Sequence, residues 1–151
     1  MKDIAFSGHR VLPKTFSKEK LRACIEKRIQ EGAENFYSGM ALGFDMLAAE
    51  CVIELKNFYP FIRLIACLPC KNQAVKYPRE EQRRYDELIK KADEIICLEE
   101  GYTDGCMLRR NDYLASHTDG VIAYCTSFKG GTVYTINRFK KEGKQVFCME
   151  E

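Results

Sequence analysis

The sequence lacks the features that mark several large classes of protein. No apolar run approaches the roughly 18 residues of a membrane span, and the N-terminus enters a strand-like segment without the pattern of a secretory signal. We therefore expect a cytoplasmic protein with no membrane partner. Lys and Arg together number 24 and Asp and Glu 22, so the net charge of +2 favours neither nucleic acid nor an acidic partner.

Motifs for common cofactors are missing as well. The first apolar run is not followed by G-x-G-x-x-G. The second apolar run does not end in the acidic residue that dinucleotide-binding domains carry about 20 residues after that motif. An ordinary NAD site is therefore not expected. The G-x-x-x-x-G-K-[ST] loop of ATPases is also absent. No histidines, cysteines or acids have the spacing of metal ligands. The sequence predicts neither a metal nor a cofactor.

The eight cysteines are interpreted as structural. Without a secretion signal they do not indicate a disulfide framework. Cys67-Leu68-Pro69-Cys70 is a C-x-x-C pair, but one pair cannot form a four-ligand zinc site, and Pro69 ends a strand where a redox motif would open a helix. Most of the others lie in apolar runs, where a thiol acts as a small hydrophobic group: Cys24, Cys51, Cys97, Cys125 and Cys148.

Strand-like apolar runs alternate with helical periods along the whole chain. Phe61–Leu68 is apolar except for Arg63, which is typical of a strand covered on both faces and hence of a parallel sheet. With no repeat or linker, we predict a single domain over residues 1–151, with an α/β, doubly wound, Rossmann-like fold. Its six-stranded, mostly parallel sheet carries helices on both faces. Strands are expected near residues 3–6, 34–38, 61–68, 94–98, 120–125 and 145–149, and helices near 17–32, 44–55, 78–92, 105–117 and 129–143.

The stretch from Ser38 to Leu55 joins a small-residue turn to the start of a helix. Gly39 and Gly43 would let a ligand approach the backbone, and apolar residues then recur at helical spacing. A helix start offers free N–H groups and a positive dipole end to an anion. Asp45 has two interpretations: a helix cap or first-turn acid, or a contact to a ligand hydroxyl or base.

Ser38-Gly39-x-Ala41-x-Gly43-x-Asp45-x-x-Ala48 resembles the motif of the SLOG superfamily. This superfamily groups the Rossmann-like domains of the DNA-processing Smf/DprA proteins and the LOG phosphoribohydrolases. Leu42 and Ala49 depart from the pattern, because the DNA-processing branch commonly has an arginine and a histidine there. The chain is most similar to the small, single-domain YpsA-like bacterial branch. The resemblance extends in four segments from Phe6 to about Thr135 and implies a nucleotide-type ligand.

Ligands of such sheets bind beyond the carboxyl ends of the strands, where the strand order reverses. Four segments with small, hydroxylic or cationic residues are expected at that edge. They supply the candidate residues for binding the ligand and its phosphate: Ser7, Gly8, Arg10, Ser38, Gly39, Gly43, Asp45, Arg110, Asn111, Gly130, Gly131 and Thr132.

The two later segments resemble further SLOG motifs. Arg109-Arg110-Asn111 is similar to an Arg-Arg-Asn segment of the DNA-processing proteins. Consecutive helical residues diverge by about 100°, so only one arginine can face the site, and we choose Arg110. Gly130-Gly131-Thr132 resembles the second glycine-rich motif and either binds phosphate or serves as an ordinary turn and cap. Arg10 is either a phosphate contact or a surface arginine.

Three functions fit the resemblance. The first is a sensor or binding domain for a nucleotide or nucleotide derivative. The second is a phosphoribohydrolase, whose P-G-G-x-G-T-x-x-E motif supplies a glutamate; alignment on Gly130-Gly131 places Asn137 there, and a shifted frame places Arg138. Since neither is a carboxylate, no catalytic residue is expected. The third, single-stranded DNA binding, is less favoured because the loops carry few cations. The sequence leaves open whether the chain forms a homo-oligomer.

Overall fold

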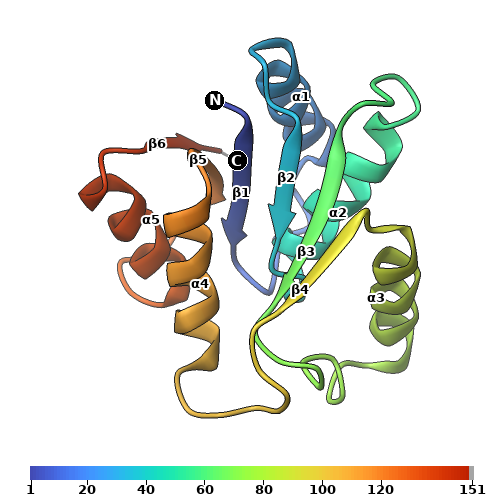
Figure 1. Ribbon diagram of the computed structural model, residues 1–151, viewed down its shortest axis with the longest axis vertical. Helices are drawn as coiled ribbons and strands as arrows, with labels where there is room; N and C mark the ends of the chain where they lie inside the picture. Colours follow the sequence, from blue (N-terminus) through green and yellow to red (C-terminus); the bar gives the residue numbers. More distant parts are fainter. Residues whose placement is uncertain (150–151) are drawn as a thin grey trace.

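The computed structural model describes residues 1–149 and contains one sheet of six strands (Figure 1). All five pairs of neighbouring strands are parallel. The strand order is β4-β3-β2-β1-β5-β6. The strands are β1 Asp3–Gly8, β2 Asn35–Ser38, β3 Arg63–Leu68, β4 Glu94–Cys97, β5 Gly120–Tyr124 and β6 Gln145–Cys148.

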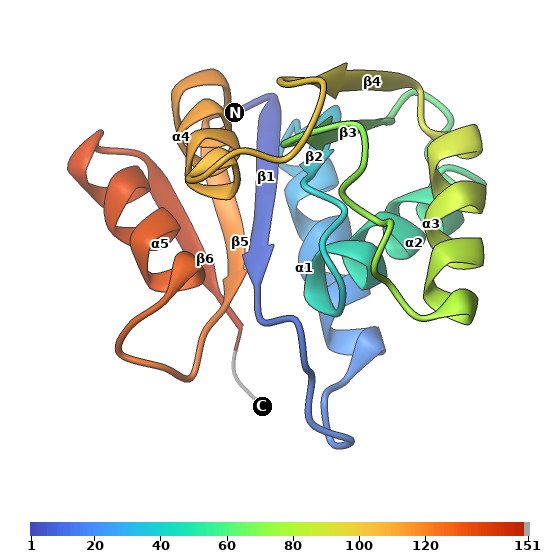
Figure 2. The ribbon, with the colours of Figure 1, turned by 90° about the horizontal axis from the view of Figure 1, so that it is seen from below.

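Five helices in the described part of the chain connect these strands and cover both faces of the sheet. Figure 2 shows α1, α2 and α3 on one face and α4 and α5 on the other. The predicted Rossmann-like α/β fold is therefore confirmed. The helices are α1 Lys18–Gln30, α2 Phe44–Leu55, α3 Arg79–Lys91, α4 Cys106–His117 and α5 Gly131–Lys141.

The strand order reverses at β1. Strands β1 to β4 follow one another outward in one direction, whereas β5 pairs with the free side of β1 and β6 lies beyond it. Gly8 of β1 pairs with Tyr124 of β5, so the loops that follow both strands start at the same level of the sheet. In a doubly wound sheet this reversal opens a crevice at the carboxyl ends of the two strands.

The core lies in two parts, one on each face of the sheet. On the first face α2 is buried on almost all sides, because it packs on the strands and also between α1 and α3. Its predicted apolar stripe, including Phe44, Val52 and Leu55, belongs to this larger cluster. On the second face Leu114 of α4 and Phe139 of α5 pack over the sheet in a smaller cluster.

The cysteines require one correction. All eight are free thiols, and Cys67 and Cys70 are buried. Cys97 and Cys148, interpreted from the sequence as buried hydrophobic groups, are instead exposed. They end β4 and β6, the two edge strands, where an apolar run does not imply a covered side chain.

Residues 1–149 contain neither a membrane-spanning helix nor a cluster of metal-ligating side chains. None of the helices formed by these residues is long and apolar enough to cross a membrane. Within the same residues, no group of three or more His, Cys, Asp and Glu side chains could hold a metal ion.

The start of α2 depends on a glycine. Gly43 has a φ of +80° and precedes the helix without any side-chain cap. A Cβ at this position would collide with backbone atoms of His9 and Arg10. The amide of Phe44 also donates to the carbonyl oxygen of His9 at 3.1 Å. Gly43 therefore allows the β1–α1 and β2–α2 loops to pack directly against each other beside the crevice.

We predict that Gly43→Ala lowers the free energy of unfolding by about 2–5 kcal/mol, because a left-handed residue with a Cβ costs about 1–2 kcal/mol and overpacking adds about 1–3 kcal/mol. Gly32→Ala is the matched control: its φ is +110°, but a Cβ there meets nothing within 4 Å. Gly32→Ala should therefore lower the free energy of unfolding only by the backbone cost of about 1–2 kcal/mol. Urea denaturation followed by circular dichroism measures both. Equal losses in the two variants would contradict the packing argument.

Candidate functional site

A cavity of about 290 Å³ lies at the carboxyl edge of the sheet, at the reversal between β1 and β5. This is the lower edge of the sheet in Figure 1, where the arrowheads of β1 and β2 point. Its volume is near the lower end of the range of ~300–1,000 Å³ for small-molecule sites. It is lined by Ser7, Gly8, His9, Arg10, Ala41, Asp45, Met107, Arg110, Asn111, Gly131 and Thr132.

Eight of the residues proposed from the sequence thus come together around this cavity. They arrive from four separate parts of the chain: the end of β1 with the loop after it, the start of α2, the first half of α4 and the start of α5. The other four, Ser38, Gly39, Gly43 and Gly130, do not line it.

Arg110 faces the cavity and Arg109 does not. Arg110 exposes only 5 % of its surface. Its Nη1 donates to the carbonyl oxygen of Gly39 at 2.7 Å, and its Nε donates to Oδ1 of Asn111 at 2.9 Å. Its Nη2 has no hydrogen-bond partner among residues 1–149. Arg109 turns instead to the β4–α4 loop, where it pairs with Glu99 at 3.1 Å and bonds to Thr103.

Ser38 and Gly39 support the site from behind. Ser38 is fully buried; its hydroxyl donates to the carbonyl oxygen of Asp45 at 2.8 Å and accepts from the amide of Met40 at 3.2 Å. A Cβ on Gly39 would collide with the guanidinium of Arg110. These residues of the motif therefore fix Asp45 and Arg110 without lining the cavity.

Asp45 is a buried acid with an unused oxygen. It exposes 6 % of its surface, and Oδ1 has no hydrogen-bond partner among the described residues. Burial raises the pKa of Asp45 to about 6, against the opposing effects of the Arg110 charge, a hydrogen bond from the backbone of Ala41 and the Arg10 charge. Asp45 is not the N-cap residue of α2, because Gly43 holds that position. Its carboxylate also keeps one oxygen without a hydrogen bond from the described residues.

The start of α5 forms another wall of the cavity. Gly130 is its N-cap, with a φ of +115° and no side chain to cap the helix, so no side chain accepts the first amides. Gly131 and Thr132 line the cavity, and the amide Nδ2 of Asn111 lies 3.8 Å from where a Cβ of Gly131 would be. Uncapped amides and the positive end of the helix dipole together favour an anion here.

Three lining residues were not among the candidates from the sequence: His9, Ala41 and Met107. Nε2 of His9 accepts a hydrogen bond from the amide of Thr126 at 2.8 Å, which joins the loops after β1 and β5. The pairing of β1 with β5 could have suggested this contact only once the strand order was known. Met107 precedes Arg110 by three residues, one helical turn, so choosing Arg110 also implied Met107.

A larger hollow of about 390 Å³ lies between α2 and α3. Three of its charged side chains are engaged in ion pairs: Arg84 pairs with Glu50 and with Glu81, and Glu54 pairs with Lys18 and Arg22. No buried polar atom without a partner points into it among the described residues. The smaller cavity at the carboxyl edge is therefore the stronger candidate.

The strand reversal, the glycine turn before α2 and the cavity beside it define a Rossmann-like domain of the SLOG type. The chain belongs to the YspA SLOG family, whose model (YpsA) matches residues 12–148. This match confirms the resemblance found in the sequence.

Two relatives support the assignment. The SPbeta prophage-derived protein YoqJ of Bacillus subtilis is 33% identical over 137 residues, covering 82% of this chain and 80% of the relative. The UPF0398 protein BH1768 of Halalkalibacterium halodurans is 29% identical over 134 residues, covering 87% of this chain and 71% of the relative.

Solved structures of DNA processing protein A share the fold. The protein from Streptococcus pneumoniae superposes with a TM-score of 0.69 at 23% identity, over 99% of this chain but 50% of that one. The protein from Helicobacter pylori gives a TM-score of 0.72 at 23% identity, over 99% of this chain and 66% of that one. The chain therefore spans about half to two thirds of these proteins, and the likeness concerns the fold.

The raised pKa of Asp45 predicts a pH-dependent cost in stability. Below about pH 4 the carboxyl is protonated in both the folded and the unfolded chain. As the pH rises to about 6, the unfolded chain releases its proton first, so folding loses stability. Above pH 6 the cost is complete, at about 3 kcal/mol.

Asp45→Asn removes this titration. We predict that its free energy of unfolding, relative to the wild type, is higher at pH 7.5 than at pH 4. Urea denaturation at the two pH values measures the difference. If the free energies of unfolding of the wild type and the variant differ by the same amount at both pH values, Asp45 does not titrate as a buried acid.

Proposed function

We propose that this chain binds a nucleotide or a nucleotide-derived molecule at the carboxyl edge of its sheet, as a sensor or binding domain. The observation that carries the proposal is the unpartnered, buried Oδ1 of Asp45 in a cavity that otherwise presents donors. An acceptor beside cationic and amide donors suits a ligand that has both hydroxyl groups and an anionic group. A ribose phosphate combines the two.

In this proposal the phosphate lies against the start of α5. Backbone amides of Gly131 and Thr132 and the positive helix end favour an anion there, as they do in other phosphate-binding helices. The free Nη2 of Arg110 adds a charged donor, and Arg10 lies on the same cavity wall. Charge-assisted hydrogen bonds of this kind are the strong ones in phosphate recognition.

The sugar lies against Asp45. A ribose hydroxyl that donates to Oδ1 would satisfy the buried oxygen and stabilise the ionised carboxylate. This assigns opposite tasks to Asp45 and to the start of α5, which removes the conflict between a carboxylate and a phosphate in one site. The volume of about 290 Å³ suits a single nucleotide rather than a polymer.

Single-stranded DNA is the second candidate. It is favoured by the fold shared with DNA processing protein A, which in Helicobacter pylori has a unique single-stranded DNA binding mode. The cations that line the cavity are Arg10 and Arg110, which is few for a track of phosphates. DNA binding would appear as an affinity that falls steeply with salt and grows with the length of the strand.

A ligand screen by thermal shift tests the proposal first. Nucleoside monophosphates, cyclic dinucleotides, ADP-ribose and NAD are the compounds to compare. A ligand at 100 times its dissociation constant adds about 2.7 kcal/mol to the stability of the folded chain. Failure of every compound to raise the melting temperature would argue against a nucleotide-type ligand.

The two neighbouring arginines provide a matched pair of variants. We predict that Arg110→Ala weakens binding of the ligand from the screen by about 1.5–3 kcal/mol, the range for a charged hydrogen bond. Gly39 would keep a partner in this variant, because Nε2 of Gln73 also donates to its carbonyl oxygen at 3.0 Å. Arg109→Ala should leave the affinity unchanged, since Arg109 bonds to Glu99 and Thr103. Isothermal titration calorimetry measures the affinity of both variants for the ligand. Equal affinities of Arg110→Ala and Arg109→Ala would show that the ligand binds at another site.

We further predict that nucleoside monophosphates are bound without rapid cleavage. Cleavage of the N-glycosidic bond builds positive charge on the sugar, which a carboxylate placed beside it stabilises. Asn137 is exposed, and Arg138 pairs with Asp112 of α4, so neither aligned position supplies an acid to the cavity. Asp45 is the only acid among the described residues that line it.

Incubation with AMP, followed by chromatography of free adenine, measures this directly. We expect no release above the uncatalysed rate. Rapid release that disappears in Asp45→Asn would overturn the prediction and make Asp45 the acid of a phosphoribohydrolase.

A further inference from the structure

We propose that Phe128 is the residue that stacks on the nucleobase of the bound ligand. This inference rests on the proposed function and adds a contact for the nucleobase, the part of the ligand to which no cavity residue has been assigned. Phe128 is completely exposed, at 101 % of the reference value, on the loop between β5 and α5. It makes no ring or cation contact with any other residue of the part that the structure describes.

The loop that carries Phe128 is tied to the cavity at both ends. On one side the amide of Thr126 donates to Nε2 of His9, which lines the cavity. On the other side the loop ends at Gly131, which also lines it. Phe128 is two residues from Thr126 and three residues from Gly131, so its Cα lies within about 10 Å of the Cα atoms of both.

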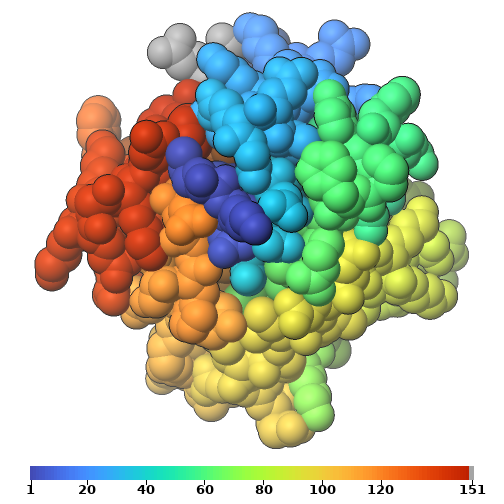
Figure 3. Space-filling model, turned by 45° about the horizontal axis from the view of Figure 1, so that its top comes forward, coloured from blue at the N-terminus to red at the C-terminus, as the bar shows by residue number. Residues whose placement is uncertain are grey.

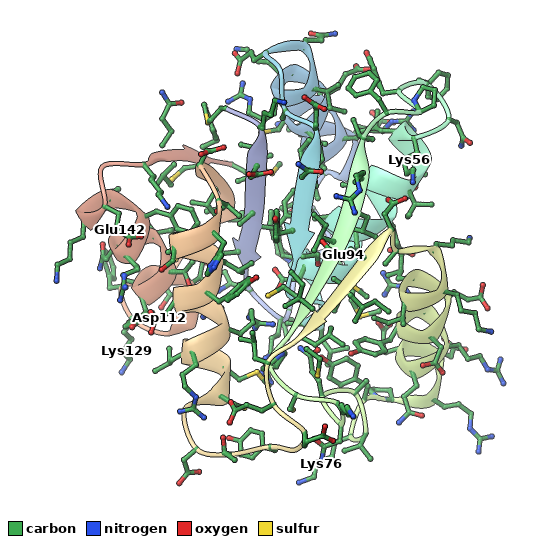
Figure 4. All side chains as sticks on the ribbon, in the orientation of Figure 1. Lys56, Lys76, Glu94, Asp112, Lys129 and Glu142 are labelled. Atoms are coloured by element: carbon green, nitrogen blue, oxygen red, sulfur yellow. The ribbon has the colours of Figure 1, made fainter. Side chains whose placement is uncertain are left out.

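The tip of this loop has a defined shape. The hydroxyl of Ser127 donates to the carbonyl oxygen of Lys129 at 2.9 Å and accepts from the Lys129 amide at 3.3 Å. The two bonds close a tight turn with Phe128 at its apex. Figure 4 shows Lys129 at the same carboxyl edge, with its side chain directed away from the sheet. The turn therefore holds Phe128, with its ring exposed to solvent, between Thr126, which bonds to His9, and Gly131, which lines the cavity.

Folding does not explain this exposure. A phenylalanine that is left fully in water forgoes about 1.5–3 kcal/mol of burial, and the turn that holds it provides no apolar neighbour. The two other exposed phenylalanines make ring or cation contacts: Arg22 lies over the ring of Phe58 at 5.6 Å, and Tyr59 meets Phe61 edge to face at 6.2 Å. Phe128 is placed to contact something that arrives at the cavity.

A nucleobase is the group that fits this position. With the phosphate at the start of α5 and the ribose at Asp45, the base is the remaining part of a nucleotide and projects toward the cavity mouth. Every base has a π-face, and stacking on an exposed aromatic contributes to binding without hydrogen bonds to base edges. Phe128 should therefore add affinity for all four bases with little preference among them.

The chain contains no tryptophan, so Phe128→Trp introduces a single fluorophore at the apex of the turn. We expect AMP, GMP, CMP and UMP to quench its fluorescence on binding, and ribose 5-phosphate to bind without quenching it. Phe58→Trp is the matched control, because Phe58 is 68 % exposed but precedes β3, on the opposite, amino edge of the sheet. Figure 3 shows that edge, where the loop at residues 56–62 (green) gathers near the start of β1 (dark blue).

Phe128→Ala gives the second readout. By calorimetry it should weaken binding of the monophosphates at least about fivefold, the lower end for one stacked base, and leave ribose 5-phosphate binding unchanged. Unchanged affinity of Phe128→Ala for all four monophosphates, or quenching of Phe128→Trp equal to that of Phe58→Trp, would overturn the inference while the proposed function stands. A wild type that binds neither ribose 5-phosphate nor any compound of the ligand screen would overturn both.

Discussion

The hydrogen bond from the buried guanidinium of Arg110 to the carbonyl oxygen of Gly39, at 2.7 Å, organises the carboxyl edge of this sheet. It joins α4, on one face, to the loop before α2, on the other face. A side chain on Gly39 would displace the guanidinium, so the glycine and the arginine require each other. The charge also partly offsets the burial of Asp45, whose pKa is still raised to about 6. A buried cation beside a buried acid with a free oxygen is costly for folding alone, which points to a use of both groups in binding.

Much of this arrangement follows from the sequence. Alternating apolar runs and helical periods predicted the strands and helices, because a buried parallel strand and a helix that packs on one face have different periods. That only one of Arg109 and Arg110 can face the cavity also follows, since one residue along a helix turns the side chain by about 100°, whereas helix geometry alone does not choose between them. The four loop segments meet at one edge because parallel strands all end there.

Other features needed the coordinates. The motif at residues 38–48 does not distinguish residues that line the cavity from those that support it: Ser38 and Gly39 fix other groups, whereas Asp45 faces the cavity. The role of Asp45 could not be decided from capping preferences, because an acid in the first turn suits both a cap and a ligand contact. His9 lies between the predicted Gly8 and Arg10, but its bond to Thr126, 117 residues away, is one that no local pattern reveals. Cys97 was misjudged because an apolar run does not indicate an edge strand.

The central claim is that a nucleotide-type ligand occupies the cavity at the reversal between β1 and β5. NMR chemical shifts of the backbone amides, followed during a titration with AMP, test it most directly. The largest changes should fall on Gly8, Ala41, Gly131 and Thr132, at the cavity walls. No changes at all, or the largest changes at Glu50, Arg83 and Leu88 in the hollow between α2 and α3, would contradict it.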